Sequence, residues 1–362
     1  MLKATGGGGG RGTAVCASEG ELRTNWQPTL EMTETLFGGG LFIEKFVPKA
    51  RHIEVQVVGD GQGGVIHCGE RECSAQRRHQ KVLEEATSPF IDLHPEVGQA
   101  MYTAAVALCK LINYRSAGTV EFLVDDSTAR FYFLELNSRI QVEHAVTEMV
   151  RPGLDLVGLM IMLGLSQITG DIFSLPAQDE VADAHGHAIE ARVYAEVPHL
   201  AFAPAPGLLT KVIWPKADHI RVDTWVETGT TVSSLYDPMI GKLIVHGRTR
   251  EEARTRLSQA LADTVLLGTA TNLAYLRTIV DDEEFANGTI TTKYLDKFPY
   301  SHSCIEVVDG GLSTTVQDGR PRLPSGGDGI PRGGPMDPLA AKAANLLVGN
   351  PVETEVLEIT IA

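Results

Sequence analysis

The sequence predicts an α+β fold with more than one domain. Apolar and polar residues alternate at positions 51–58, as in a strand with one buried face, and a glycine-containing turn at 59–61 leads into a second apolar run at 65–67. The segment 96–113 instead repeats its apolar residues with the spacing of an amphipathic helix. The length of 362 residues allows two or three domains of ordinary size.

The other elements of the first half follow in order. A helix is expected to begin near Ser18, and Pro28 should break or shift it. A short strand is expected at 41–43. A second hairpin is expected at 119–135, and a helix follows from 143 to 165.

The second half is separated from the first by the polar, proline-containing segment 174–184, which is typical of a domain junction. Beyond it we expect a helix at 250–264, a linker at 299–303, and strands at 187–196, 208–213, 220–226 and 240–246. These elements predict three domains, at 1–165, 180–298 and 305–362.

Composition excludes several classes of function. The net charge of −15 argues against general binding of nucleic acid or of anionic membrane, since both need a basic surface. Five scattered cysteines without a CxxC pair indicate neither a disulfide framework nor a zinc site, and they favour a reducing, cytoplasmic location. The longest apolar run, 154–165, is too short to span a bilayer and is expected to be a buried helix.

The predicted hairpin at 119–135 places two carboxylates opposite each other. With the turn near Thr128, Glu121 and Glu135 face one another across the strands, and opposed like charges destabilise a sheet. A Mg²⁺ ion would neutralise them, and Asn137 lies two residues further on the same face. If this pair stood alone, an exposed hairpin with solvated carboxylates would be the better interpretation.

The pair continues into a polar series in which every second residue is an acid, an amide or a guanidinium: Glu135, Asn137, Arg139, Gln141 and Glu143. In an extended chain these side chains project to one side. They would make a poor core and a good polar site, in which Arg139 holds an anionic substrate and Glu143 moves a proton.

Two further segments suit an anionic ligand. Lys3 precedes five glycines at 6–10, and such small residues allow backbone N–H groups to close on a phosphate. A flexible linker is an equally good interpretation of the glycines. Their spacing does not match the Walker A motif. The basic segment 77–81 also stands out in so acidic a chain, but taken alone it is typical of a solvated turn.

Taken together, several segments resemble the successive motifs of the biotin carboxylase family, in order. The segments are 3–10, 42–47, 51–57, 76–81, 135–144, 186–192, 221–225 and 236–242. The resemblance covers about residues 1–298. It implies a partial ATP-grasp domain at 1–165, with its first part missing, and a biotin carboxylase C-terminal domain at 180–298.

The resemblance also implies roles for individual residues. It assigns ATP binding to Lys3, Gly9, Gly10, Glu44, Lys45, Phe46, Val47, His52, Gln76, His79, Glu121 and Glu135. It assigns Mg²⁺ (or Mn²⁺) to Glu121, Glu135 and Asn137. It assigns bicarbonate to Lys81, Arg139, Gln141 and Val142, and biotin to Arg139 and Arg221. Catalysis would rest on Lys81, Arg139 and Glu143, with Glu143 as the general base that deprotonates bicarbonate.

The last segment, 305–362, resembles the opening of the mostly-β carboxyltransferase domain of urea carboxylases, through 311–318, 333–337 and 344–350. The implied function is ATP-dependent carboxylation of biotin, with urea as the final acceptor and biotin on a carrier domain that this chain lacks. No nucleic-acid or membrane partner is expected, and the full-length protein is a candidate homo-oligomer. Because the family has further segments at both ends, we expect the chain by itself to be inactive and poorly soluble.

Two alternatives stay open at this point. One is the biotin carboxylase part of a different biotin-dependent carboxylase, which acts on an acyl-CoA or on pyruvate. The other is a non-catalytic remnant that binds nucleotide or associates with intact subunits.

Overall fold

The structure is a computed structural model, and it describes residues 1–6, 12–171, 173–181, 183–301, 311–318 and 333–360. Two compact units form, Met1–Ser301 and His302–Ala362. The predicted phosphate-binding residues Gly9 and Gly10 lie outside the described residues. Within the described part of the chain, no helix is both long enough and apolar enough to cross a membrane.

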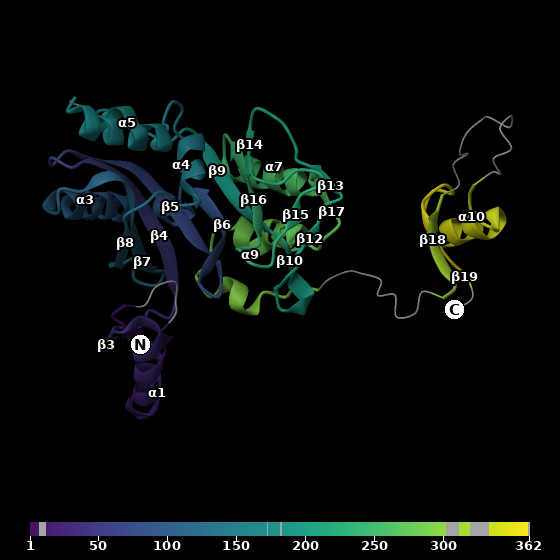
Figure 1. Ribbon diagram of the computed structural model, residues 1–362, viewed down its shortest axis with the longest axis horizontal. Helices are drawn as coiled ribbons and strands as arrows, with labels where there is room; N and C mark the ends of the chain where they lie inside the picture. The colour runs from purple at the N-terminus through teal and green to yellow at the C-terminus, as the bar shows by residue number, and fades with distance from the viewer. Residues whose placement is uncertain (7–11, 172, 182, 302–310, 319–332, 361–362) are drawn as a thin grey trace. The chain divides into compact units, whose positions relative to one another are not determined.

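The first unit is built around one eight-stranded sheet (Figure 1). From edge to edge its strands are β14 (Ile220–Thr224), β16 (Met239–Gly247), β9 (His187–Tyr194), β6 (Gln80–Ala86), β5 (Val65–Arg77), β4 (Ala50–Asp60), β7 (Arg115–Asp125) and β8 (Phe131–Asn137). All neighbouring strands are antiparallel. Since β6 pairs with β9, this single sheet runs through both of the first two predicted domains.

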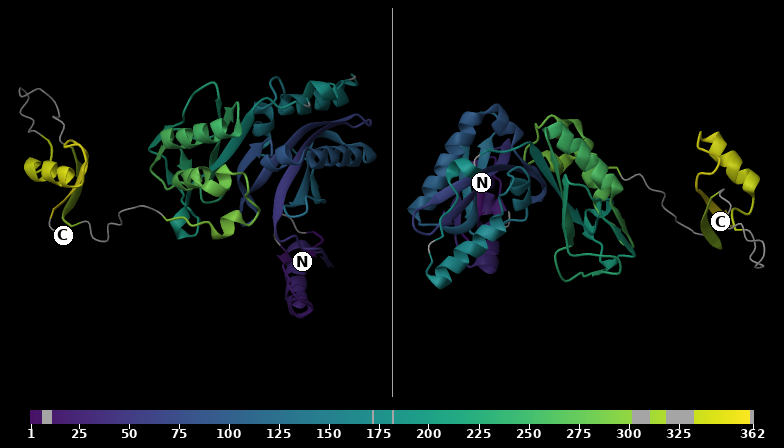
Figure 2. Two further views of the ribbon diagram at one scale, coloured as in Figure 1. Left: turned by 180° about the vertical axis from the view of Figure 1, so that it is seen from behind. Right: turned by 90° about the horizontal axis from the view of Figure 1, so that it is seen from above.

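Helices cover both faces of this sheet. Helix α3 (Pro95–Leu111) packs on the face of β4 that carries Ile53, Val55 and Val57, whereas α5 (Leu156–Thr169) packs on the opposite face (Figures 1 and 2). Helices α7 (Arg250–Asp263) and α8 (Leu273–Asp281) cover the part formed by β9 and β16. The predicted helices at 96–113 and 250–264 and the predicted hairpin at 119–135 are thereby confirmed.

Strand β4 departs from its prediction in a way that locates the site. The alternation at 51–58 predicts one buried face, but the polar side chains His52, Glu54 and Gln56 are buried as well as the apolar ones. A strand in the middle of a covered sheet has no solvent-facing side. Its polar residues must therefore find partners inside the protein.

Two helix predictions were wrong. The expected helix at 143–165 is split into α4 (His144–Met149) and α5, because Pro152 and Gly153 interrupt it and Asp155 caps α5 by accepting a hydrogen bond from the Gly158 amide. Conversely, α1 (Glu19–Phe37) continues through Pro28. A proline removes only one hydrogen bond from a helix, and the rest of this 19-residue helix is retained.

The remaining elements are short. In the first unit, β1 (Leu2–Ala4) pairs with β2 (Thr13–Ala14) and β3 (Leu41–Ile43) beside α1. The other pairs are β10 (Glu196–Val197) with β11 (Ala203–Pro204), β12 (Gly207–Leu208) with β15 (Thr231–Val232), and β13 (Lys211–Ile213) with β17 (Val265–Leu267). The short helices are α2 (Pro89–Leu93), α6 (Gln178–Val181), α9 (Glu283–Ala286), η1 (Pro198–Leu200) and η2 (Tyr294–Lys297). The second unit contains α10 (Pro338–Leu347) and the pair β18 (Ser313–Gln317) and β19 (Val356–Thr360).

Candidate active site

The site begins as a row of charged side chains across four neighbouring strands. Glu54 on β4 is the register partner of Arg71 on β5 and of Glu121 on β7, and Glu121 is the partner of Glu135 on β8. The predicted opposition of Glu121 and Glu135 is therefore confirmed. Residues in register lie on the same face of a sheet, so three carboxylates and one guanidinium share a narrow strip.

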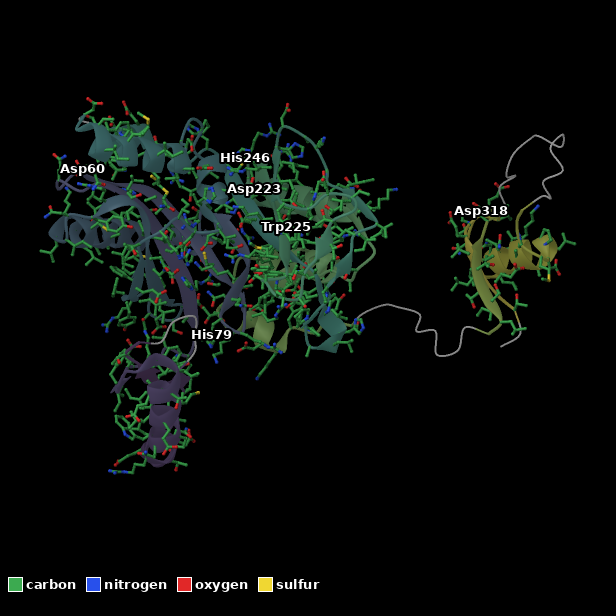
Figure 3. The ribbon with its side chains drawn as sticks, in the orientation of Figure 1. Asp60, His79, Asp223, Trp225, His246 and Asp318 are labelled. Atoms are coloured by element: carbon green, nitrogen blue, oxygen red, sulfur yellow. The ribbon has the colours of Figure 1, made fainter. Side chains whose placement is uncertain are left out.

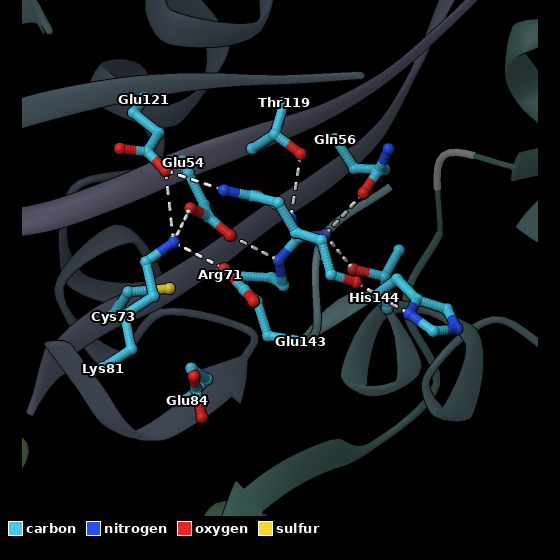
Figure 4. A network of polar contacts seen from close by, with 12 residues as sticks. Glu54, Gln56, Arg71, Cys73, Lys81, Glu84, Thr119, Glu121, Glu143 and His144 are labelled. Atoms are coloured by element: carbon cyan, nitrogen blue, oxygen red, sulfur yellow. Dashed lines mark hydrogen bonds and ion pairs between the residues drawn. The ribbon is translucent and has the colours of Figure 1, made fainter. Parts of the chain in front are cut away.

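Arg71 neutralises the buried end of this row. Its side chain is fully buried and donates hydrogen bonds of 2.6–3.1 Å to five side chains: Glu54, Gln56, Thr119, Gln141 and Thr147 (Figure 4). Burial would raise the pKa of the Glu54 carboxyl, but Lys81 and Arg71 lower it to about 2. Glu54 is thus an anion held between two cations.

Lys81 joins three carboxylates at the centre of the site (Figure 4). Its Nζ donates to Glu54 Oε2 and Glu143 Oε1 at 2.5 Å each and to Glu121 Oε1 at 3.2 Å. Burial alone would lower the pKa of the ammonium group, but Cys73 and the surrounding carboxylates raise it well above its ordinary value. Lys81 is therefore a permanent cation in this position.

Glu143 is a buried carboxylate between two cations. Arg192 Nη2 donates to its Oε2 at 2.9 Å, on the side opposite Lys81. Burial and the neighbouring Glu54 would raise the pKa of Glu143, yet Lys81, Arg192 and Arg71 lower it. An ionised carboxylate beside two anion-binding groups is suited to accept a proton from an anionic substrate.

Beyond Asn137 the predicted polar series does not stay extended. Strand β8 ends there, and the following residues turn, so Gln141 and Glu143 point into the buried network while Arg139 is exposed and donates to the Ile140 carbonyl. The expectation that all five side chains share one face was therefore wrong, because it assumed a longer strand. The roles given to Arg139 stay a prediction.

A cavity of about 320 Å³ lies beside the charged row. It is lined by ten of the residues predicted for ATP: Lys3, Glu44, Lys45, Phe46, Val47, His52, Gln76, His79, Glu121 and Glu135. Thr292, Lys293 and Asp296 line it as well and were not predicted. Lys293 Nζ lies 5.5 Å from the centre of the Phe46 ring, so the chain beyond residue 290 forms one wall of the cavity.

His52 connects this cavity to the carboxylates. Its Nδ1 lies 2.7 Å from Gln76 Nε2, and its Nε2 lies 3.2 Å from Glu121 Oε2. His52, Glu54 and Glu121 offer ligand atoms within 4.8 Å of one another. Glu121 therefore belongs both to this cluster and to the predicted metal set with Glu135 and Asn137, in which Asn137 Nδ2 donates to Glu135 Oε1 at 3.3 Å.

The remaining predicted residues lie further along the sheet. Arg221 forms ion pairs with Glu148 at 2.6 Å and with Asp223 at 2.8 Å, and Asp223 lies near Trp225 at the end of β14 (Figure 3). Lys242 lies 3.2 Å from Asp223 and donates to the carbonyl of Val142, the residue before Glu143. The contribution of Arg221 to biotin binding stays a prediction.

Sequence reasoning missed the arginines and glutamates that hold the site together: Glu54, Arg71, Glu84, Glu190 and Arg192. Three of them stand in segments already singled out, 51–57 and 186–192. The available signal was that charged residues occupy strand positions among apolar neighbours, where a solvated charge is not expected.

Comparisons with known proteins divide the chain in three. The family model for the carbamoyl-phosphate synthase L chain ATP binding domain matches residues 1–169, and that for the biotin carboxylase C-terminal domain matches 190–297. The model for the carboxyltransferase domain, subdomain A and B, matches 328–362.

Individual proteins agree with these matches. A putative urea carboxylase from Emericella nidulans is 46% identical over all of this chain and 29% of its own length. The crystal structure of urea carboxylase from Kluyveromyces lactis matches with a TM-score of 0.75 and 45% identity, over 87% of this chain and 27% of that one. The biotin carboxylase domain of 2-oxoglutarate carboxylase from Hydrogenobacter thermophilus, in complex with MgADP, ADP and bicarbonate, matches with a TM-score of 0.76 and 39% identity, over 83% of this chain and 65% of that one. The chain thus spans less than a third of the length of the two urea carboxylases.

Proposed function

Since the chain belongs to the biotin carboxylase family, whose ATP-binding and C-terminal domains it carries, we propose that it carboxylates biotin with bicarbonate in an ATP- and Mg²⁺-dependent reaction. The observation that carries this proposal is the position of Glu121. Its side chain lines the cavity and also accepts a hydrogen bond from Lys81, which in turn contacts Glu143. A nucleotide in the cavity would therefore adjoin the carboxylate that accepts a proton.

Glu143 is the proposed general base. One of its oxygens, Oε1 or Oε2, takes the proton of bicarbonate, and the resulting carbonate oxygen attacks the γ-phosphorus of ATP, so that the bond to ADP breaks and carboxyphosphate and ADP form. Carboxyphosphate breaks down to CO₂ and phosphate, and CO₂ adds to N1 of biotin as the phosphate takes up the N1 proton. The low pKa of Glu143 keeps it ionised, so that the base is ready at neutral pH.

Lys81 and Arg192 are the cations that we propose to bind the negatively charged substrate. Both already contact Glu143, one on each oxygen, so an anion bound to them lies next to the base. Preorganised cations stabilise charge that develops in the transition state without reorganising at the moment of reaction. Arg139, Gln141 and Val142 complete the proposed bicarbonate site.

Glu121, Glu135 and Asn137 are the proposed Mg²⁺ ligands, and the first two line the cavity. Mg²⁺ prefers carboxylate and amide oxygens, and Glu121, Glu135 and Asn137 offer them on adjacent strands. When bound it would neutralise phosphate oxygens of ATP. The likeness to a domain in complex with MgADP and bicarbonate supports these two ligands.

Biotin and its carrier are the proposed second substrate, with Arg139 and Arg221 as binding residues. Urea is the proposed final acceptor, supported by the urea carboxylase that matches the whole chain and by the carboxyltransferase match at its end. We further propose a cytoplasmic location and a homo-oligomeric full-length protein.

The test is phosphate release from ATP by the purified full-length protein, with and without bicarbonate and free biotin. We expect release to need bicarbonate, and Glu143→Gln to lower it at least about 100-fold. Glu96→Gln, at an exposed glutamate, is the matched control and should leave the rate unchanged. Release that ignores bicarbonate, or an unaffected Glu143→Gln variant, would contradict the proposal. MgADP binding without any turnover would favour a nucleotide-binding remnant.

A further inference from the structure

Behind the site lies a second pair of carboxyl groups. Glu84 on β6 and Glu190 on β9 are register partners, and both side chains are buried. Opposed like charges destabilise a sheet, and a buried carboxylate without compensation is far more costly than an exposed one. Two ionised carboxylates at these positions therefore need either enough cations or a proton.

The hydrogen bonds of the two groups differ sharply. Glu84 Oε1 accepts a hydrogen bond of 2.5 Å from Arg192 Nε. Neither oxygen of Glu190 has a hydrogen-bond partner among the described residues. The cation paired with Glu190 is Lys242, whose Nζ lies 3.7 Å from Glu190 Oε2 and is already engaged by the Val142 carbonyl and by Asp223 at 3.2 Å.

The cations around the pair are too few for all the acids. Arg192 is shared by Glu84 and Glu143, and Lys242 is shared by Glu190 and Asp223. Arg221 also binds Asp223, but it is shared with Glu148, and Arg71 is engaged by Glu54. Lys81 contacts Glu143 but also serves Glu54 and Glu121. The part of the cluster nearest Glu190 therefore carries an excess of negative charge unless one acid is neutral.

We propose that Glu84 and Glu190 hold one proton between them, with Glu190 as the protonated member, and that the ionised Glu84 positions Arg192 against Glu143. Arg192 then bridges two carboxylates, with Nε on Glu84 and Nη2 on Glu143. Both glutamates are positioning residues, because neither reaches the proposed substrates directly. The burial of the pair supports this assignment, since it raises the pKa of both carboxyl groups.

The positioning of Arg192 for the reaction rests on the proposed function. The protonation of Glu190 does not depend on it. A neutral Glu190 leaves Glu84 as the anion that anchors Arg192, and Nη2 of the same guanidinium also binds Glu143 and can meet an anionic substrate. Were Glu190 ionised, it would compete for Arg192 and weaken the field that keeps Glu143 ionised.

The first experiment measures the proton without any assay of activity. Infrared difference spectra of the purified chain at neutral pH compare Glu190→Gln with the wild type. We expect the variant to lose the carbonyl stretch of one protonated carboxyl group, whereas the exposed control Glu96→Gln loses none. The thermal midpoint of Glu190→Gln should stay close to that of the wild type, because a neutral amide replaces a neutral acid. A spectrum in which Glu190→Gln removes no such band would overturn the proposal.

The second experiment measures positioning. We expect Glu84→Gln to lower kcat/KM for bicarbonate about tenfold or more and to displace the acid limb of its pH profile, since Arg192 loses its anchor. Glu84→Asp should recover part of this loss, which a merely structural defect would not do. A Glu84→Gln variant within about twofold of the wild type would remove the positioning role. If the wild-type protein carboxylates no biotin, the proposed function fails. The infrared result still shows whether Glu190 is protonated.

Discussion

Arg71 is the residue whose loss should damage the first unit most. Its guanidinium donates to five side chains carried by β4, β7, α4 and the segment before α4, so it joins elements that are distant in sequence. Arg71→Met keeps the approximate length of the side chain and removes every donor. The acceptors then stay buried without their partner, and unsatisfied buried acceptors are costly.

The magnitude follows from the structure. Removing one partner of a buried ion pair costs about 3–5 kcal/mol, and the second cation on Glu54, Lys81, keeps the value away from the upper end. We expect a loss of about 4 kcal/mol. For a unit of this size each kcal/mol lowers the thermal midpoint by about 2 °C, which gives a decrease of about 8 °C.

The assay is differential scanning calorimetry of the chain and two variants. Arg23→Met is the matched control, because Arg23 forms one ion pair, with Glu19, on the exposed surface of α1. An exposed pair of this kind contributes about 0–1 kcal/mol, so the control should move the midpoint by no more than about 2 °C. If the two variants shifted the midpoint equally, the buried network would not be the source of stability that its hydrogen bonds imply.

Three further outcomes are expected. Glu121→Gln combined with Glu135→Gln should abolish Mg²⁺-dependent nucleotide binding in titration calorimetry, and undiminished binding would remove the metal assignment. Glu143→Gln and Arg139→Ala should each lower biotin carboxylation far more than MgADP affinity, and equal losses in both measurements would count against their roles. Burial would raise the pKa of Glu85, but Arg250 and His187 lower it from its ordinary 4.5 to about 2. Because the folded-state pKa is the lower one, its contribution to stability is present above pH 4.5 and is lost as the pH falls towards 2; midpoints measured across this range should fall less in Glu85→Gln than in the wild type.

Local patterns in the sequence were sufficient for the elements with a regular period. The hairpin at 119–135, the helices at 96–113 and 250–264, and the register of Glu121 with Glu135 all follow from alternation, helical spacing and the position of a turn. These features depend on residues close together in the chain. The sequence does contain a signal for the split, namely Pro152 and Gly153. The apolar run at 154–165 nevertheless favoured the prediction of one continuous helix.

The site itself depends on pairings that no local pattern contains. Lys81 meets Glu143 across 62 positions, and Arg192 meets Glu84 across 108, because β6 lies between β5 and β9 in the sheet. Strand order decides which charged side chains share a face, and burial on both faces of β4 turns its polar residues from solvated groups into network members. The residue types of the site were therefore determined by the sequence. Which acid faces which cation, and hence which carboxyl group keeps its proton, was decided only by the tertiary structure, because electrostatic interactions act through distance in space and through the exclusion of water.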